Sequence, residues 1–133
     1  MQEPDNQLFF PTVEQELAFG PENLKIDPAD IQQRIDKTLA ELNIENLRNK
    51  ETHNLSFGQK KLVTFASLLT LDPQVFLLDE LSAGLSEEFI SKIKHILKRL
   101  AKEDKTIFLT DHTGDLLEIA DDVIQLEGGS NEK

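Results

Sequence analysis

The sequence predicts an α/β fold, with a parallel sheet in the second half of the chain and an α-helical subdomain in the first half. Short apolar runs at Val75–Leu78 and Thr106–Leu109 predict strands, the first of them fully buried, and a helical stretch separates the two. A third run at Asp122–Leu126 predicts a further strand. Because strands that alternate with helices form parallel sheets, we expect these strands to run in the same direction.

The first half of the chain favours helices, and no stretch in it is a convincing strand. Thr12 predicts the N-cap of a short helix that ends at Phe19, because Gly20 and Pro21 follow. Further helices are expected to begin near Asp27, Ser56, Ser86 and Asp115. The length of 133 residues fits one domain, which we divide into a helical portion at 1–71 and a strand-containing portion at 72–133.

Charge and composition exclude several classes of function. The chain has 25 acidic and 14 basic residues, and a formal net charge of -11 argues against non-specific binding to nucleic acid or to an anionic membrane. There is no cysteine, which excludes disulfides and thiol-ligated metals and fits a cytosolic setting. The opening residues lack the basic and apolar regions of a signal peptide, and no apolar run approaches the roughly 20 residues of a membrane helix.

Two adjacent carboxylates, Asp79 and Glu80, follow the first predicted strand. In open α/β sheets, ligands bind outside the carboxyl ends of the strands. In an ATPase that handles phosphates, the first acid would hold Mg²⁺ and the second would orient or polarise the attacking water. The alternative interpretation is a strand that is followed by an acidic surface loop.

Two further segments are candidates for phosphate contacts. Ser56–Gln59 combines a capping box with a glycine, and the free N–H groups of a helix start attract anions. His112 lies just past the second predicted strand, where an imidazole can donate a hydrogen bond to a phosphate oxygen. The alternatives are a cap that serves only its helix and an idle surface histidine. Gln2 has no signal of its own, and the basic run Lys92–Arg99 is interpreted as a solvated helix face.

These pieces, in this order, resemble the second half of an ATP-binding cassette ATPase, which implies a P-loop NTPase-like sheet. Leu55–Gln59 resembles the signature motif Leu-Ser-Gly-Gly-Gln, Val75–Glu80 the Walker B strand with its catalytic glutamate, Ser82–Ser86 the D-loop, His112 the switch histidine and Gln2 the Q-loop glutamine. The stretch Gln2–Leu24 is similar to energy-coupling-factor and cobalt-type importers. The resemblance covers nearly the whole chain.

The resemblance implies ATP and Mg²⁺ as cofactors and assigns roles to individual residues. It implies a catalytic role for Glu80 and His112, nucleotide contacts for Ser56, Gly58, Gln59, Gln2 and His112, and metal contacts for Asp79 and Gln2. In the family, the signature motif contacts ATP held by the opposite subunit, so the implied partner is a second cassette subunit. The stretch Gln2–Glu22 would face a transmembrane component, which implies a cytoplasmic location on the inner face of the membrane.

The sequence departs from the family pattern at several positions. Phe57 replaces the first signature glycine, Leu81 replaces a proline and Ser86 replaces the D-loop aspartate. None of the six glycines is followed by lysine, so the Walker A loop Gly-x-x-x-x-Gly-Lys is missing. A missing Walker A strand would leave a bare sheet edge beside Thr106–Leu109, and we expect the isolated chain to be poorly stable, to swap strands or to shift its last strand into the gap.

Three functions remain in competition. The first is part of an ATP-hydrolysing subunit that powers the import of a vitamin or a metal ion. The second is a non-catalytic half-cassette that completes a partner's ATP site through its signature motif. The third is an ATPase of DNA maintenance, against which the acidic charge and the importer-like Gln2–Leu24 stretch both count.

Overall fold

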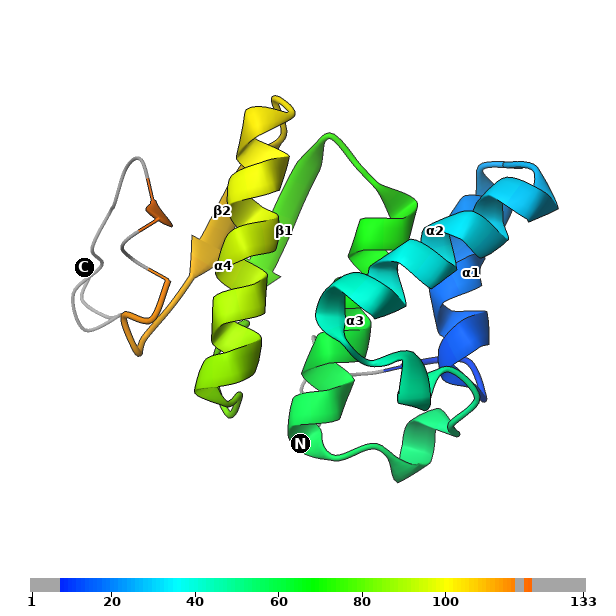
Figure 1. Cartoon of the computed structure of the whole chain (residues 1–133), viewed down its shortest axis with the longest axis horizontal. Helices are drawn as coiled ribbons and strands as arrows, with labels where there is room; N and C mark the ends of the chain where they lie inside the picture. The colour runs from blue at the N-terminus through cyan, green and yellow to red at the C-terminus, as the bar shows by residue number, and fades with distance from the viewer. Residues whose placement is uncertain (1–7, 117–118, 121–133) are drawn as a thin grey trace, which may run out of the picture.

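The computed structural model describes residues 8–116 and 119–120 (Figure 1). In chain order the elements are α1 (Val13–Asn23), α2 (Pro28–Leu42), two short 3-10 helices (Glu45–Leu47 and Thr52–Asn54), α3 (Phe57–Leu71), β1 (Val75–Asp79), α4 (Glu87–Lys102) and β2 (Thr106–Thr110). Helices α1, α2 and α3 gather at one end, and α4 lies over the two strands at the other (Figure 1). The α/β fold with a helical first half is therefore confirmed. The strand expected at Asp122–Leu126 and the candidate Gln2 lie outside the described residues.

Helix α1 is longer than the sequence predicted. It runs through Gly20 and Pro21 to Asn23, so the prediction that these two residues stop it was wrong. Proline at this position has no N–H to donate to the carbonyl of Leu17, four residues earlier. The hydroxyl of Thr70 on α3, which is fully buried, donates to this carbonyl at 2.7 Å. The tertiary contact therefore satisfies the acceptor that the proline leaves open.

Local side-chain chemistry sets the starts of the helices. Thr12 and Gln15 form a capping box at α1, and Ser56 and Gln59 form one at α3, both as predicted. The Ser86 hydroxyl accepts from the N–H of Phe89 and caps α4. Since each cap satisfies N–H groups that a helix start leaves open, these positions were readable from sequence.

The two strands form a parallel pair. The register places Val75 beside Thr106 and Asp79 beside Thr110, so both strands end at the same level. The side chains that follow them therefore meet at one edge of the sheet, as expected for a ligand site in an α/β fold.

The prediction that β1 is fully buried was wrong. Phe76 and Leu78 are buried, but Val75 is 47% and Leu77 is 70% exposed, and Phe108 on β2 is 61% exposed. Helix α4 turns its apolar side toward the core, with Ile90, Ile93, Leu97 and Leu100 buried. The opposite face of the sheet is hollowed into a groove of about 570 Å³, whose lining includes Leu77 and Phe108 on the strand side and Thr64 and Leu68 of α3 on the other.

The basic run on α4 is not wholly a solvated face. Arg99 pairs with Glu41 of α2 at 3.0 Å and with Glu103 at 3.2 Å, and its side chain is 29% exposed. Arg99 therefore ties α4 to the helical end of the molecule. Lys98 beside it is exposed, as predicted for the run.

Candidate functional site

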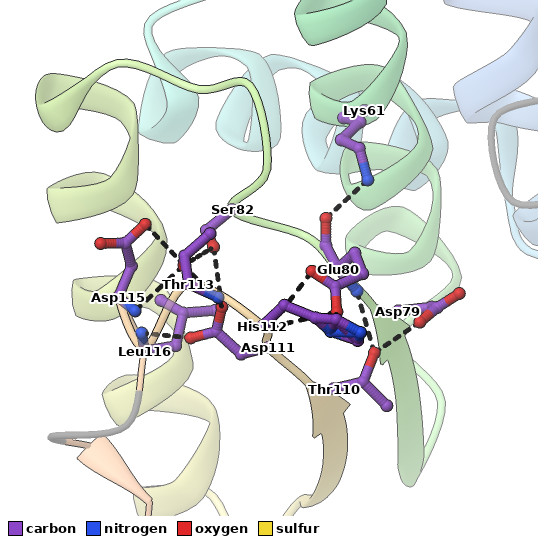
Figure 2. A network of polar contacts seen from close by, with 10 residues as sticks. All are labelled: Lys61, Asp79, Glu80, Ser82, Thr110, Asp111, His112, Thr113, Asp115 and Leu116. Carbon is purple, nitrogen blue, oxygen red and sulfur yellow. Dashed lines mark hydrogen bonds and ion pairs between the residues drawn. The ribbon is translucent and has the colours of Figure 1, made fainter. Parts of the chain in front are cut away.

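The acid pair, Asp79 and Glu80, stands where β1 ends (Figure 2). Thr110, its neighbour at the end of β2, donates its hydroxyl to Oδ1 of Asp79 at 2.5 Å. The Glu80 N–H lies 3.1 Å from both the carbonyl and the hydroxyl oxygen of Thr110. The parallel register thus fixes the acid pair from the neighbouring strand, and sequence analysis assigned no role to Thr110.

Glu80 and His112 lie together, although they are far apart in the sequence. Nδ1 of His112 contacts Oε2 of Glu80, and the backbone N–H of His112 donates to the same carboxylate at 3.1 Å (Figure 2). The Glu80 side chain is 24% exposed and that of His112 is 82% exposed. A carboxylate that is held in this way is oriented while one side remains open to solvent, which is the arrangement a general base needs.

The oxygen donors at the acid pair fit a magnesium ion. Mg²⁺ prefers hard oxygen ligands and usually takes one or two carboxylates, with water and substrate phosphates filling the other positions. Asp79 is exposed and offers such a carboxylate next to the Thr110 hydroxyl. Among the described residues no cluster of three or more His, Cys, Asp or Glu side chains is suited to a metal. A magnesium ion at Asp79 would therefore take most of its remaining ligands from water and from the phosphates of a nucleotide.

A second polar network holds the loop 111–116, and sequence analysis missed it. Oδ1 of Asp111 accepts from the Ser82 hydroxyl at 3.2 Å and from the Thr113 hydroxyl at 2.8 Å, while Oδ2 accepts from the Leu116 N–H at 2.7 Å. Burial alone would raise the pKa of Asp111, but the hydrogen bonds from Leu116, Thr113 and Ser82 outweigh it and lower the pKa below its usual value. A charged Asp111 therefore joins the loop after β1 to the loop that carries His112.

The Ser56–Gln59 segment forms the start of α3. The Ser56 hydroxyl accepts from the Gln59 N–H at 3.1 Å, and the Gln59 side chain accepts from the Ser56 N–H at 2.9 Å. In the part of the chain that the structure describes, the N–H groups of Phe57 and Gly58 make no hydrogen bond. Capping thus consumes part of the segment, and two N–H groups stay available for an anion.

The start of α3 packs against the loop after the acid pair. A Cβ added to Gly58 would meet the Gly84 carbonyl oxygen at 3.4 Å, and one added to Gly84 would meet the Phe57 ring at 3.2 Å. Gly84 also has a φ of +80°, a conformation that side chains disfavour. The structure therefore brings Asp79, Glu80 and His112 into one cluster and places Ser56, Gly58 and Gln59 at a separate surface, which this loop connects to the cluster.

The comparisons identify the class of protein that this site defines. The family model described as "ABC transporter" matches residues 2–83, which is more than half of the chain, so the chain belongs to the ABC transporter family. A solved structure of CbiO1 from Clostridium perfringens, titled as part of the ABC transporter complex cbiONQ, shares the fold with a TM-score of 0.68 at 40% identity. The match covers 86% of this chain and 46% of that one. The fold is therefore that of a P-loop NTPase, as the resemblance implied.

Within this family, the relatives include ATP-binding proteins of energy-coupling factor transporters. The chain is 41% identical over 130 residues to the energy-coupling factor transporter ATP-binding protein EcfA of Methanoculleus marisnigri, a match that covers 96% of this chain and 47% of the relative. It is 42% identical to EcfA2 of Clostridium perfringens, covering 96% of the chain and 46% of the relative. The chain thus spans about half the length of the curated relatives it matches. None of the helices in its described portion is long and apolar enough to span a bilayer.

Proposed function

We propose that this chain is part of the ATP-hydrolysing subunit of an energy-coupling-factor-type importer. The observation that carries the proposal is the convergence of Asp79, Glu80 and His112 at the carboxyl edge of the parallel strands. Asp79 would hold Mg²⁺ beside the nucleotide phosphates. Glu80 would accept a proton from the attacking water, and His112 would both orient Glu80 and contact the γ-phosphate. The solute would be a vitamin or a metal ion.

The helical portion at 1–71 supplies the contacts to partners in this proposal, and the portion at 72–133 supplies the chemistry. Phe9 is 77% and Phe19 is 45% exposed, and the Phe19 ring lies 4.8 Å from that of Phe10. Exposed aromatic side chains are typical of protein interfaces. These residues belong to the Gln2–Glu22 stretch, which would face the transmembrane component and hold the subunit at the inner face of the membrane.

The second candidate is a half-cassette that completes a partner's ATP site. The N–H groups of Phe57 and Gly58, which make no hydrogen bond within the described residues, favour it, since they offer an anion site that does not need the acid pair. In this case Ser56, Gly58 and Gln59 of the chain would contact ATP that is held by the Walker A loop of the second subunit. The chain itself would hydrolyse nothing.

A complementation assay separates the two functions. In one mixture this chain is combined with a Walker A-bearing segment that lacks its own acid pair, and in a second mixture with an EcfA-type subunit whose signature motif is disabled; ATP hydrolysis is measured in both. Under the first function the first mixture hydrolyses ATP, and Glu80→Gln abolishes that hydrolysis. Under the second function only the second mixture hydrolyses ATP, and there Glu80→Gln has no effect whereas Ser56→Ala abolishes hydrolysis. Thr12→Ala is the matched control, because it removes the capping-box hydroxyl of α1 at a similar cost of ~1 kcal/mol without touching the signature segment or the D-loop. Hydrolysis that no variant changes would contradict both.

For the chain on its own, we expect no ATP hydrolysis. It lacks the Gly-Lys loop that cradles the β-phosphate, so Glu80→Gln is silent there. In a cassette that contains both the Walker A loop and this chain, Glu80→Gln should trap bound ATP. Normal turnover by that variant would refute the role of Glu80.

A further inference from the structure

Lys61 is a buried cation that contacts the backbone of the proposed catalytic residue, Glu80, and belongs to none of the motifs. Lys61, on the second turn of α3, is only 6% exposed. Its Nζ donates to the backbone carbonyl oxygen of Glu80 at 2.5 Å (Figure 2). Burying an ammonium group is costly unless it finds partners. Lys61 is therefore not an ordinary surface lysine, and its buried position needs a structural or functional explanation.

The backbone of Glu80 has an unusual conformation. Its φ is +52°, in the left-handed region that residues with a Cβ disfavour. Such a conformation persists only where the surroundings fix it, and it occurs often at active sites. At Glu80 the chain turns out of β1, so this conformation decides where the carboxylate points.

The N–H, the carbonyl and the carboxylate of Glu80 each have a hydrogen-bond partner. Its N–H is held by Thr110, and its carboxylate by the N–H and ring of His112. Its carbonyl oxygen accepts a long hydrogen bond from the Ala83 N–H at 3.3 Å and a short one from Nζ of Lys61 at 2.5 Å. Lys61 is therefore the strongest partner of this carbonyl and the only one of these partners that comes from the helical portion.

The same ammonium group also contacts the start of α3. Nζ of Lys61 lies 5.4 Å from the centroid of the Phe57 ring, within the range of a cation–π interaction. Phe57 stands between Ser56 and Gly58, and its ring fills the space that a Cβ at Gly84 would need. One side chain thus contacts both the segment offered to a partner's nucleotide and the backbone of the chain's own candidate base.

We propose that Lys61 is a positioning residue, which holds the Glu80 backbone in its left-handed conformation and couples the carboxylate to the start of α3. The proposal deepens the proposed function and rests on it for the catalytic meaning of Glu80. The contact between Lys61 and Glu80 can be tested without measuring ATP hydrolysis, so the positioning role of Lys61 and the proposed function can be refuted independently.

The first test uses the unmodified chain. In a sample labelled with ¹⁵N and ¹³C, a hydrogen bond from the Lys61 ammonium group transmits a scalar coupling to the carbonyl carbon of Glu80. We expect that coupling together with a slowly exchanging Lys61 ammonium signal. A Lys61 ammonium signal that is sharp and exchanges as fast as that of Lys98 would overturn the proposal, and this readout needs no variant to fold.

The second test compares three variants by amide hydrogen exchange. Lys61→Met keeps the apolar stem and removes the donor, and we expect exchange at His112 and Glu80 to rise about tenfold, the factor for a lost hydrogen bond to a charged group. Lys61→Arg should restore slow exchange, and Lys60→Met is the matched control one position away. Unchanged exchange in Lys61→Met, or a rise of equal size throughout α1, α2 and α3, would reduce Lys61 to a structural residue and overturn the proposal.

A rate measurement links the contact to function. In a cassette assembled with a Walker A-bearing segment, Lys61→Met should lower kcat for ATP about tenfold with little change in KM, because the base is misplaced while the nucleotide contacts remain. A loss confined to KM would overturn the positioning role. Amide exchange that behaves as expected in an assembly that hydrolyses no ATP would instead support the contact and refute the proposed function.

Discussion

The helical end and the strand end of this molecule differ in how fully their apolar side chains are covered. In the helical end, Leu17, Ile35, Leu39 and Phe65 are all at most 1% exposed, and α1, α2 and α3 cover one another. In the strand end, α4 covers one face of the β1–β2 pair, while Leu77 and Phe108 stand open on the other. The comparison teaches that a sheet of parallel strands needs layers on both faces, whereas three packed helices leave few apolar side chains uncovered.

The largest expected effect comes from two phenylalanines placed on opposite sides of this comparison. Phe65 is 1% exposed and Phe108 is 61% exposed. In the isolated chain, Phe65→Ala should lower the free energy of unfolding by about 3–5 kcal/mol, since it empties a packed site. Phe108→Ala should change it by less than about 0.5 kcal/mol, as at other surface positions. Urea unfolding followed by circular dichroism measures both. Equal losses would mean that the groove is covered in solution.

The second prediction concerns the contact between Thr70 and Leu17. Thr70→Val keeps the shape and removes the hydroxyl, leaving the Leu17 carbonyl buried without its donor, so we expect a loss of about 1–3 kcal/mol. Thr70→Ser keeps the hydroxyl and is the matched control. In a Pro21→Ala background the helix regains an N–H, and Thr70→Val should cost clearly less there. An equal loss of stability in both backgrounds would show that the contribution of the Thr70 hydroxyl does not depend on Pro21.

The third prediction tests the polar network of the strand end. Asp111→Asn should cost about 1 kcal/mol at neutral pH, a value reduced for partial exposure, because the carboxylate accepts four hydrogen bonds. The pKa of Asp111 is lower in the folded protein than its usual 3.8, so its stabilisation is present above that value and is lost as the pH falls through the lower folded value. Unfolding measured from pH 7 to pH 2 should therefore show the two proteins converge in acid. A constant difference would show that charge is not the cause.

The smallest effect separates two neighbours on α4. Arg99→Gln should cost up to about 1 kcal/mol, because Arg99 pairs with Glu41 across the two ends, whereas Lys98→Gln should cost close to nothing. The Arg99 effect should also shrink as salt is added, since screening weakens ion pairs. Thermal unfolding at low and high salt checks both. A salt-independent loss would assign the effect to packing of the arginine stem.

Much of the fold was predictable because local chemistry sets it. Two capping boxes, formed by Thr12 with Gln15 and by Ser56 with Gln59, correctly predicted the starts of α1 and α3. The apolar run before Asp79 correctly predicted β1. These signals depend on residues a few positions apart. The end of α1 was predicted wrongly, because the donor that accommodates Pro21 sits on Thr70, far along the chain and invisible to a local rule.

The sequence predicted which motif residues belong to the candidate site, but not the other residues that hold them in place. Asp79, Glu80 and His112 were found through the order of short motifs, and the parallel register then explains why they meet. Thr110, Asp111 and Lys61 carry no motif, and their parts depend on distances that only the folded chain defines. The exposure of Leu77 was missed for a similar reason, since an apolar strand reads as buried whether or not a neighbour covers it.

The bond between Thr70 and Leu17 also has an evolutionary consequence. The proline inside α1 leaves the Leu17 carbonyl without an intrahelical donor, and the hydroxyl at the fully buried position 70 supplies one, so the two positions depend on each other. Positions 21 and 70 should therefore change together among relatives, with small apolar residues at 70 wherever 21 is not proline. A single substitution at either place would pass through a less stable ancestor, which makes the pair a slow step in the divergence of this helical end.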